Sequence, residues 1–270
     1  MGLGQFARNS GYIAPEVQKK IEEITLLIAG CGVGSQFAIA AARMGVQNFV
    51  LVDADHVEIT NLNRQAFQYK DIGKLKVEAL AAGIMAVNPE ARVEVHGNFL
   101  NEQNVQGLVA GCDYVFDTID FLDLKAILDL HECANKMNKT ILSAFSAGWG
   151  ACLVCVRPNP SSPSLMRTVF GLGQYNQDVS YTECFKNFFG KIINHLPAPV
   201  QKDMQQVILK MADSKPCPAS HVIAGSLAVA SMGTTALYNL LNDDDLNSRQ
   251  EMILVDFESI LRGKGIALKG

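Results

Sequence analysis

The chain has 270 residues, of which 49% are hydrophobic, so it can bury a substantial core within one large domain. Its formal net charge of −4 supplies no general attraction for polyanions, which disfavours a nucleic-acid partner. Seven cysteines without a paired framework, no signal-peptide pattern and no apolar run of roughly 18 residues predict a cytoplasmic protein and no membrane association.

The first predicted unit alternates strand, turn, helix and strand. Residues 24–30 form a short apolar run that ends in glycine, which predicts a buried strand. Residues 34–44 are small, apolar and helix-forming, and residues 48–53 predict a second strand that ends in an acidic residue. This order is typical of the opening of a dinucleotide-binding fold.

The same alternation continues along the next part of the chain. Helices are predicted around residues 76–87 and at 122–137, and strands at 92–96, 113–117 and 140–145. Such alternation predicts a mostly parallel sheet covered by helices on both faces. The expected fold class is therefore α/β, Rossmann-like and doubly wound.

The second half of the chain has a different pattern. Residues 157–164 form a loop rich in proline and serine, and residues 179–211 hold two amphipathic helical patterns, which we expect to contact the substrate. A small-residue helix is predicted at 219–241 and a last strand at 251–257. We therefore expect a helical insertion, followed by antiparallel strands at the C-terminal side of the sheet.

These elements predict a single domain over residues 1–270. Its expected parts are an N-terminal helical arm (1–23), a nucleotide-binding core (24–156), a loop and helical insertion (157–218), and a C-terminal helix with strands (219–270).

A glycine-rich turn joins the first strand to its helix. Gly30, Gly32 and Gly34 would let backbone N–H groups approach phosphate oxygens at the start of the helix. Glycine turns also serve packing alone, so the turn by itself leaves both interpretations open. Asp53, at the end of the second strand, could accept hydrogen bonds from ribose hydroxyls, or it could be a solvated charge at a strand end.

Three charged residues favour phosphate chemistry over hydride transfer. Arg64 lies between asparagine and glutamine, and its guanidinium could bind phosphate oxygens through two parallel hydrogen bonds. Lys76 would open the next helix and supply a second cation. Asp120 follows the fourth strand at the same edge, where a carboxylate beside phosphates is typical of a magnesium site.

Together these motifs resemble the ubiquitin-activating type of adenylyltransferase, the ThiF, MoeB and HesA superfamily. The resemblance rests on the glycine turn, Asp53 and residues 61–65, 73–78 and 117–120. It implies an enzyme that uses ATP and Mg²⁺ to convert a C-terminal carboxylate into an acyl-adenylate, with release of pyrophosphate. The implied partner is a small ubiquitin-like or sulfur-carrier protein, or a precursor peptide, and in some members sulfur or thioester transfer follows.

The resemblance also implies roles for individual residues. Gly32 would approach the phosphates and Asp53 would hold the ribose. ATP is expected to meet three side chains, those of Asn61, Arg64 and Lys76. Asp120 would hold Mg²⁺, and the cations would stabilise the charge that develops as pyrophosphate leaves.

Two further assignments come from the resemblance. Arg8 resembles an N-terminal arginine that reaches the γ-phosphate in the partner's site, which implies a homodimer. Cys217 stands at about the position of a cysteine that forms a thioester or persulfide in some members. The alternative for Cys217 is a small apolar loop residue.

The sequence departs from the family pattern at several positions. Ala29 and Cys31 stand where glycine is usual, and Phe121 follows Asp120 where asparagine is common. The family's zinc-binding pair of CxxC motifs is missing, so we expect no structural zinc. Cys152 and Cys155 lie three apart in a strand-like run, so their side chains would point to opposite faces and pack in the core.

Two alternative functions stay open. One is an enzyme like tRNA threonylcarbamoyladenosine dehydratase, from the same superfamily, although the acidic charge balance counts against it. The other is an NAD-dependent oxidoreductase or a non-catalytic dinucleotide-binding module. The first strand, turn and helix alone would fit this module, whereas Arg64, Lys76 and Asp120 disfavour it.

Overall fold

The structure, a computed structural model, describes residues 4–172, 181–212, 220–242 and 251–263. Within this part a seven-stranded sheet has the order β3-β2-β1-β4-β5-β6-β7. The strands are β1 (Thr25–Ala29), β2 (Asn48–Val52), β3 (Arg92–His96), β4 (Tyr114–Asp117), β5 (Thr140–Ala147), β6 (Gly150–Val156) and β7 (Met252–Asp256). Strands β1 to β5 pair in parallel, and β6 pairs antiparallel with both β5 and β7. This arrangement confirms the predicted fold class.

Four helices cover one face of the sheet. They are α1 (Pro15–Glu23), α2 (Gly34–Met44), α3 (Lys76–Val87) and α9 (Ile223–Leu241), and their apolar residues share one core cluster. Phe37 and Phe116 stack within this cluster, with ring centroids 3.6 Å apart. A methyl group at Gly233 would lie 2.7 Å from both rings, so glycine is what allows α9 to approach so closely.

Another core cluster forms on the opposite face. It takes side chains from α4 (Val105–Ala110), α5 (Leu124–Lys136), α6 (Leu165–Val169) and α7 (Tyr181–Ile192). Cys152 belongs to this cluster whereas Cys155 belongs to the first, so the two thiols lie on opposite faces of the sheet. Burial raises the pKa of Cys152 to about 12, as expected of a core thiol rather than a metal ligand.

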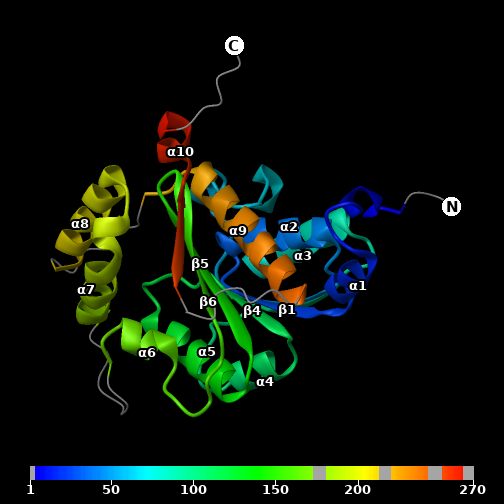
Figure 1. Cartoon of the computed structure of the whole chain (residues 1–270), viewed down its shortest axis with the longest axis horizontal. Coiled ribbons are helices and arrows are strands. Elements are labelled where there is room, and N and C mark those ends of the chain that lie inside the picture. Colours follow the sequence, from blue (N-terminus) through cyan, green and yellow to red (C-terminus); the bar gives the residue numbers. More distant parts are fainter. Residues whose placement is uncertain (1–3, 173–180, 213–219, 243–250, 264–270) are drawn as a thin grey trace.

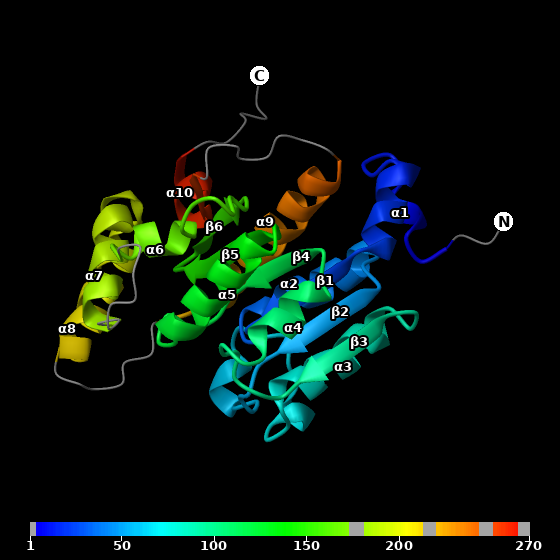
Figure 2. The ribbon, with the colours of Figure 1, turned by 90° about the horizontal axis from the view of Figure 1, so that it is seen from below.

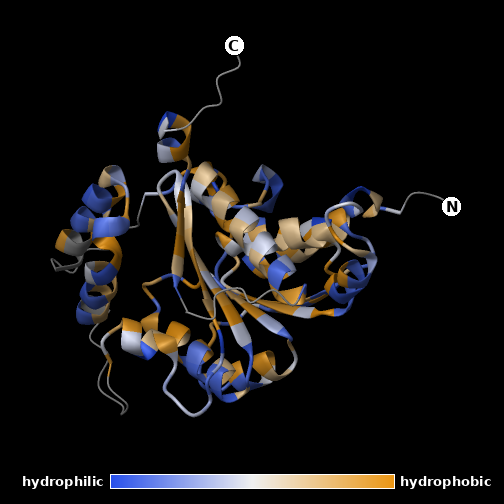
Figure 3. Cartoon of the chain, viewed as in Figure 1, coloured by the Kyte–Doolittle hydropathy of each residue, from blue (hydrophilic) through white to orange (hydrophobic). Residues whose placement is uncertain are grey.

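The two helices of the insertion stand at one end of the sheet. Figures 1 and 2 show α7 and α8 (Ala198–Ala212) side by side at this end, with α1 at the other. Aromatic rings attach α7 to the core, because Phe188 lies 5.0 Å from Phe121 and 5.8 Å from Phe145 between ring centroids. In Figure 3 the strands and α9 are largely hydrophobic, whereas α7 and α8 are mixed, as amphipathic helices are.

Three short helices were not predicted from the sequence: α4, α6 and α10 (Phe257–Gly263). Each has seven or fewer residues, too few for a helical repeat of apolar positions to stand out. Short 3₁₀ turns also occur at η1 (Ala7–Asn9), η2 (Ile59–Asn61), η3 (Tyr69–Asp71) and η4 (Ile193–His195). Among the described helices none has the length and hydropathy needed to cross a bilayer.

Candidate active site

Except for Arg8 and Cys217, the predicted site residues lie at the carboxyl ends of β1, β2 and β4 or in the segments that follow these strands. These strands are adjacent, and β1 pairs in parallel with both β2 and β4. The chain leaves β1 toward α2 on one face of the sheet and leaves β4 toward α5 on the other, so the connections part here, and we call this place at the strand ends the crevice. In open α/β sheets such a switch point is where ligands bind.

The glycine turn packs against the segment that follows β4. Gly30 has a φ of +87°, and a methyl group there would lie 2.6 Å from the carbonyl oxygen of Thr118. At Gly34 a methyl group would lie 2.5 Å from Thr118 Oγ1, which itself donates to the carbonyl oxygen of Gly30 at 2.7 Å. Both glycines therefore have a packing role in this structure.

Cys31 fills a position in the turn where the family usually has glycine. Its backbone N–H donates to Asp53 Oδ2 at 2.7 Å, which ties the turn to the end of β2. Burial, followed by the charge of Asp53, holds the pKa of the Cys31 thiol well above its ordinary value. This thiol is therefore a packing group rather than a nucleophile.

Asp53 is held in one orientation by the backbone. Its Oδ2 accepts from the Cys31 N–H, and its Oδ1 accepts from the Asp55 N–H at 2.8 Å. Burial raises the pKa of Asp53, and the ammonium of Lys76 acts in the opposite direction. The carboxylate is thus preorganised, with lone pairs still available to a hydroxyl donor.

Lys76 begins α3 and is buried. Its Nζ lies 2.7 Å from Asp55 Oδ2, and its backbone N–H donates to the Asp55 carbonyl at 2.9 Å. Asp55 is therefore a site residue to which the sequence analysis assigned no role. It lies two residues after Asp53 in the printed sequence, which was the available signal.

Arg64 carries a buried donor without an acceptor. One terminal nitrogen donates to the Thr60 carbonyl and to Asn63 Oδ1, both at 2.9 Å. The Nε–H is buried and has no hydrogen-bond partner in the described part of the chain. Burial holds the pKa of Arg64 below its ordinary value, while the charge of Asp120 opposes that shift. A buried unpaired guanidinium N–H is costly to the fold and is suited to an anionic ligand.

Asp120 lies in a segment that is fixed by hydrogen bonds. Asp117, where β4 ends, accepts from Ser143 Oγ at 3.0 Å and lies 2.9 Å from His131 Nε2. Asp120 Oδ1 accepts from the Leu122 N–H at 3.0 Å. In the described ranges no three His, Cys, Asp or Glu side chains gather as a metal-binding group. Asp120 therefore fits Mg²⁺ only in the mode where one carboxylate, phosphates and waters share the ion.

Asn61 and Gln65 flank Arg64 and are both buried. Asn61 Oδ1 accepts from the Glu58 N–H at 3.0 Å and so closes the η2 turn. Gln65 Oε1 is buried and has no hydrogen-bond partner among the described residues. A methyl group added at Gly32 would lie 3.2 Å from Gln65 Nε2. Gln65 therefore faces the glycine turn, although the sequence analysis gave it no role.

Arg8 does not join the other predicted residues. Its neighbours Gln5 and Asn9 donate to the carbonyl groups of Val87 and Met44, the last residues of α3 and α2. Because α2 begins at the carboxyl edge of the sheet and ends before β2 begins, these carbonyls lie at the amino edge. Arg8 is thus at the edge opposite its own crevice. Cys217 lies outside the described residues.

His221 is a site residue that the sequence analysis left without a role. Its Nδ1 lies 2.6 Å from Ser146 Oγ, although the two residues are 75 positions apart. Its carbonyl accepts from Asn63 Nδ2 at 3.1 Å. Burial lowers the pKa of His221, as does Arg64, whereas Asp120 and Asp203 act in the opposite direction. No local spacing could have revealed this contact.

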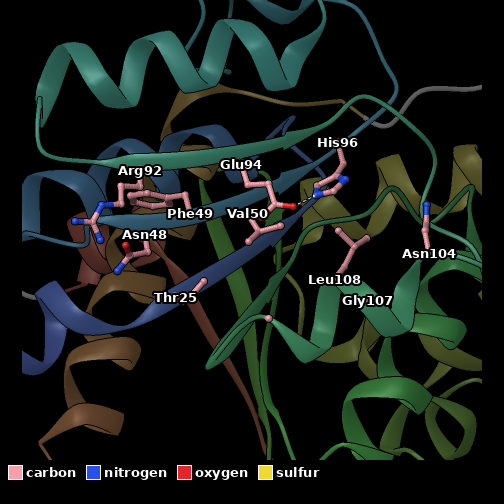
Figure 4. A pocket seen from close by; sticks show the side chains of 11 residues that line it. Thr25, Asn48, Phe49, Val50, Arg92, Glu94, His96, Asn104, Gly107 and Leu108 are labelled. Atoms are coloured by element: carbon pink, nitrogen blue, oxygen red, sulfur yellow. Dashed lines mark hydrogen bonds and ion pairs between the residues drawn. The ribbon is translucent and has the colours of Figure 1, made fainter.

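A separate hollow of about 550 Å³ lies between α4 and strands β1 to β3 (Figure 4). Its lining residues are Thr25, Asn48, Phe49, Val50, Arg92, Glu94, His96, Asn104, Gly107, Leu108 and Gly111. It includes none of the predicted site residues, and within it His96 Nε2 lies 2.7 Å from Glu94 Oε1. We therefore assign the candidate site to the crevice at the strand ends.

Comparisons with known proteins agree with the fold described above. The sequence model of the ThiF family matches residues 6–259. The chain is 28% identical over 260 residues to the tRNA threonylcarbamoyladenosine dehydratase of Bacillus subtilis (strain 168), covering 90% of this chain and 97% of that protein. It is 30% identical over 164 residues to ubiquitin-like modifier-activating enzyme 5 of Drosophila persimilis, covering 52% of this chain and 43% of that enzyme.

Among solved structures, E. coli MccB with ATP has a TM-score of 0.66 to this chain at 18% identity. The match covers 94% of this chain and 72% of that one. At this level of identity the likeness shows the shared Rossmann-like fold alone.

Proposed function

Because the chain belongs to the ThiF family, we propose that it is an ATP- and Mg²⁺-dependent adenylyltransferase that converts a substrate carboxylate into an acyl-adenylate. The observation that carries this proposal is the buried Nε–H of Arg64, which has no acceptor among the residues that the structure describes. Arg64 lies beside Asp120, at the same crevice as Asp53 and the glycine turn. A triphosphate would supply the missing acceptor.

Each residue of the crevice has a part in this proposal. Asp53 accepts hydrogen bonds from the ribose hydroxyls, in the orientation that the Cys31 and Asp55 N–H groups impose. Arg64 and Lys76 bind phosphate oxygens, and Asp120 holds Mg²⁺. When bound there, the ion would supply positive charge that stabilises pyrophosphate as it leaves.

Adenylation itself needs no protein nucleophile. A carboxylate oxygen of the substrate attacks the α-phosphorus, a P–O bond forms, and the bond to pyrophosphate breaks. The enzyme's contribution is to hold two anions in line and to stabilise the negative charge of the transition state. The charged ends of both side chains are held in place, that of Arg64 by the Thr60 carbonyl and that of Lys76 by Asp55, which suits that positioning.

The first candidate substrate is the C-terminal carboxylate of a small ubiquitin-like or sulfur-carrier protein, or of a precursor peptide. The net charge of −4 favours a peptide or protein substrate over a polyanion. The relative from Drosophila persimilis carries the name of a ubiquitin-like modifier-activating enzyme, in agreement with this class.

The second candidate substrate is a carboxylate on a tRNA nucleoside. It is favoured by one observation, which is that the dehydratase from Bacillus subtilis matches over 97% of its own length. That relative's name refers to threonylcarbamoyladenosine in tRNA. Both candidates require the same adenylation step.

ATP/pyrophosphate exchange tests the proposal. A synthetic peptide ending in Gly-Gly and a tRNA that carries N6-threonylcarbamoyladenosine are the two probes. We expect exchange that depends on one of them and that is lost in Arg64→Ala and Asp120→Ala. The matched control is Lys19→Ala on α1, where an exposed lysine pairs with Glu23. Reduction of NAD without any exchange would favour the oxidoreductase alternative instead.

Cys217 is proposed as an acceptor of the activated acyl group or of sulfur. The test is Cys217→Ala, with adenylation and the subsequent transfer measured separately. Retained adenylation with lost transfer is the expected result. If both steps are unchanged, the thiol has no chemical role.

A further inference from the structure

A cluster of polar side chains lies beside the crevice, at the segment that leads into α9. It consists of Ser146 on β5, His221 before α9, Asp203 on α8, and Asn63 beside Arg64. The adenylation step proposed above uses none of these four side chains. The cluster joins the insertion to the nucleotide end of the site.

Three separate elements hold His221, one through its ring, one through its carbonyl group and one through the preceding residue. Ser146 Oγ lies 2.6 Å from His221 Nδ1, and Asn63 Nδ2 donates to the His221 carbonyl at 3.1 Å. The preceding residue, Ser220, donates from its N–H and its hydroxyl to Asp203, at 3.1 and 2.8 Å. The backbone at His221 is thus held by α8 and the Arg64 segment, and the ring itself is oriented by Ser146 on β5, as a catalytic group requires.

The imidazole lies within electrostatic reach of the proposed phosphate ligands. Arg64 and Asp120 both act on His221, and Asp203 is the other charged side chain that does so. Nδ1 is engaged with Ser146, and within the described ranges Nε2 has no hydrogen-bond partner. One ring nitrogen is therefore oriented by the protein, and the other is available to a ligand.

We propose that His221 is a catalytic residue of the step that consumes the acyl-adenylate, with Nε2 as general base for the attacking nucleophile and Ser146 as its positioning residue. This inference rests on the proposed adenylation. The nucleophile is an amine, thiol or amide of the acceptor, whose N–H or S–H proton passes to Nε2. A bond forms between the nucleophile and the acyl carbon, the bond from that carbon to the phosphate oxygen breaks, and AMP leaves.

The surroundings suit this role for a neutral ring. The Ser146 hydroxyl donates to Nδ1 or accepts from it according to the tautomer. The tautomer that carries its proton on Nδ1, donated to Ser146, leaves the Nε2 lone pair free to take a proton. Arg64 would stabilise the phosphate of departing AMP while the ring receives the proton.

The test separates the two half-reactions. Adenylation is measured by ATP/pyrophosphate exchange with whichever of the two probes supports it. Transfer is measured as AMP release, with glycinamide as acceptor for the Gly-Gly peptide, and with the modified nucleoside's own amide as acceptor for the tRNA. In His221→Asn, which keeps a polar group toward Ser146, we expect AMP release to fall about 100-fold, the typical contribution of a general base. Exchange should fall at most a few-fold.

Further variants distinguish chemistry from structure. In His221→Gly, added imidazole should restore AMP release by at least about tenfold, because a free base then occupies the vacated space. Ser146→Ala should lower the rate of AMP release. Ser146→Thr keeps the hydroxyl group and should release AMP at about the wild-type rate. Ser231→Ala, at an exposed serine on α9, is the matched control and should leave both steps unchanged.

Three results would overturn the inference. They are unaltered AMP release in His221→Asn, an equal fall of exchange and AMP release, and an acyl group found on Ser146 by mass spectrometry. Failure of adenylation is distinct from these, because wild-type protein would then show no exchange with either probe.

Discussion

The guanidinium of Arg64 shows how a binding site can cost stability. Its Nε–H is buried without an acceptor, so the ligand-free fold bears a desolvation penalty of about 1–3 kcal/mol. We therefore expect Arg64→Ala to leave the melting temperature of the ligand-free protein unchanged or slightly higher. ATP affinity should fall by about 100-fold, since charge-assisted hydrogen bonds to phosphate are lost. Calorimetric titration and thermal unfolding check the two halves.

Lys19→Ala serves as control for the loss of one positive charge. Lys19 lies on α1 in an exposed pair with Glu23, away from the crevice. The Lys19→Ala variant should bind ATP with the same affinity as the wild type. Unfolding of ligand-free Arg64→Ala at a markedly lower temperature would contradict the view that Arg64 is held for a ligand.

The pKa of Asp53 gives a prediction for the pH dependence of ATP binding. Burial raises this pKa, so on acidification the carboxyl takes up its proton at a higher pH than an ordinary aspartate does. Because only the carboxylate accepts from both ribose hydroxyls, ATP affinity should weaken as the pH falls through the raised pKa. Titrations of ATP binding over a series of acidic pH values measure this loss of affinity.

The Asp53→Asn variant distinguishes the protonation of Asp53 from denaturation of the protein by acid. The amide cannot ionise, so affinity should be lower at neutral pH by about tenfold or more and should lose this pH dependence. Retention of the wild-type profile would assign the titration to another group. The same raised pKa means that the folded state binds more protons than the unfolded state in this window. Ionisation of Asp53 therefore lowers stability as the pH rises through it.

At the scale of elements, α7 is attached to the core by aromatic rings. Phe188 is buried and lies near Phe121, Phe145, Phe170 and Phe189. Phe188→Ala should lower the free energy of unfolding by about 3–5 kcal/mol, because it removes apolar contacts and leaves a cavity. Denaturant unfolding measures this change.

Lys186→Ala, on the exposed side of the same helix, provides the control. Its free energy of unfolding should change by less than about 0.5 kcal/mol. Equal effects of the two substitutions would mean that the aromatic contacts do not hold α7. Phe121 belongs to this aromatic group, which explains why a phenylalanine is accommodated where the family commonly has asparagine.

At the scale of the whole molecule, the position of Arg8 bears on the predicted homodimer. Arg8 lies at the amino edge of the sheet and its own crevice at the carboxyl edge. It can therefore reach a nucleotide only in a partner's site. Mixing Arg8→Ala with Arg64→Ala subunits should restore about a quarter of wild-type exchange activity, because half the dimers are mixed and each has one intact site.

The complementation has a clear contrary outcome. If Arg8 has no role in a partner's site, Arg8→Ala alone keeps full activity and mixing adds nothing beyond the average of the two proteins. Sedimentation of the mixture under the assay conditions shows whether dimers are present.

Much of the fold could be predicted because its strongest signals are local. The runs that became β1 and β2, and the helices α2 and α3, carry their period and their boundaries in neighbouring residues. The helix α4 could not be found this way, because six residues do not complete two turns. The hollow beside α4 could not be predicted either, because residues of β1, β2, β3 and α4 line it together.

The sequence by itself determined the parallel α/β architecture, the glycine turn and the set of charged residues at the strand ends, because these depend on local pattern and on motif order. Only the tertiary structure decided that Asp55 pairs with Lys76, that Gln65 faces the glycine turn and that Ser146 meets His221. It also decided that Arg8 lies away from its own crevice. These relations join segments that are distant in the chain, and such contacts are fixed by packing rather than by spacing.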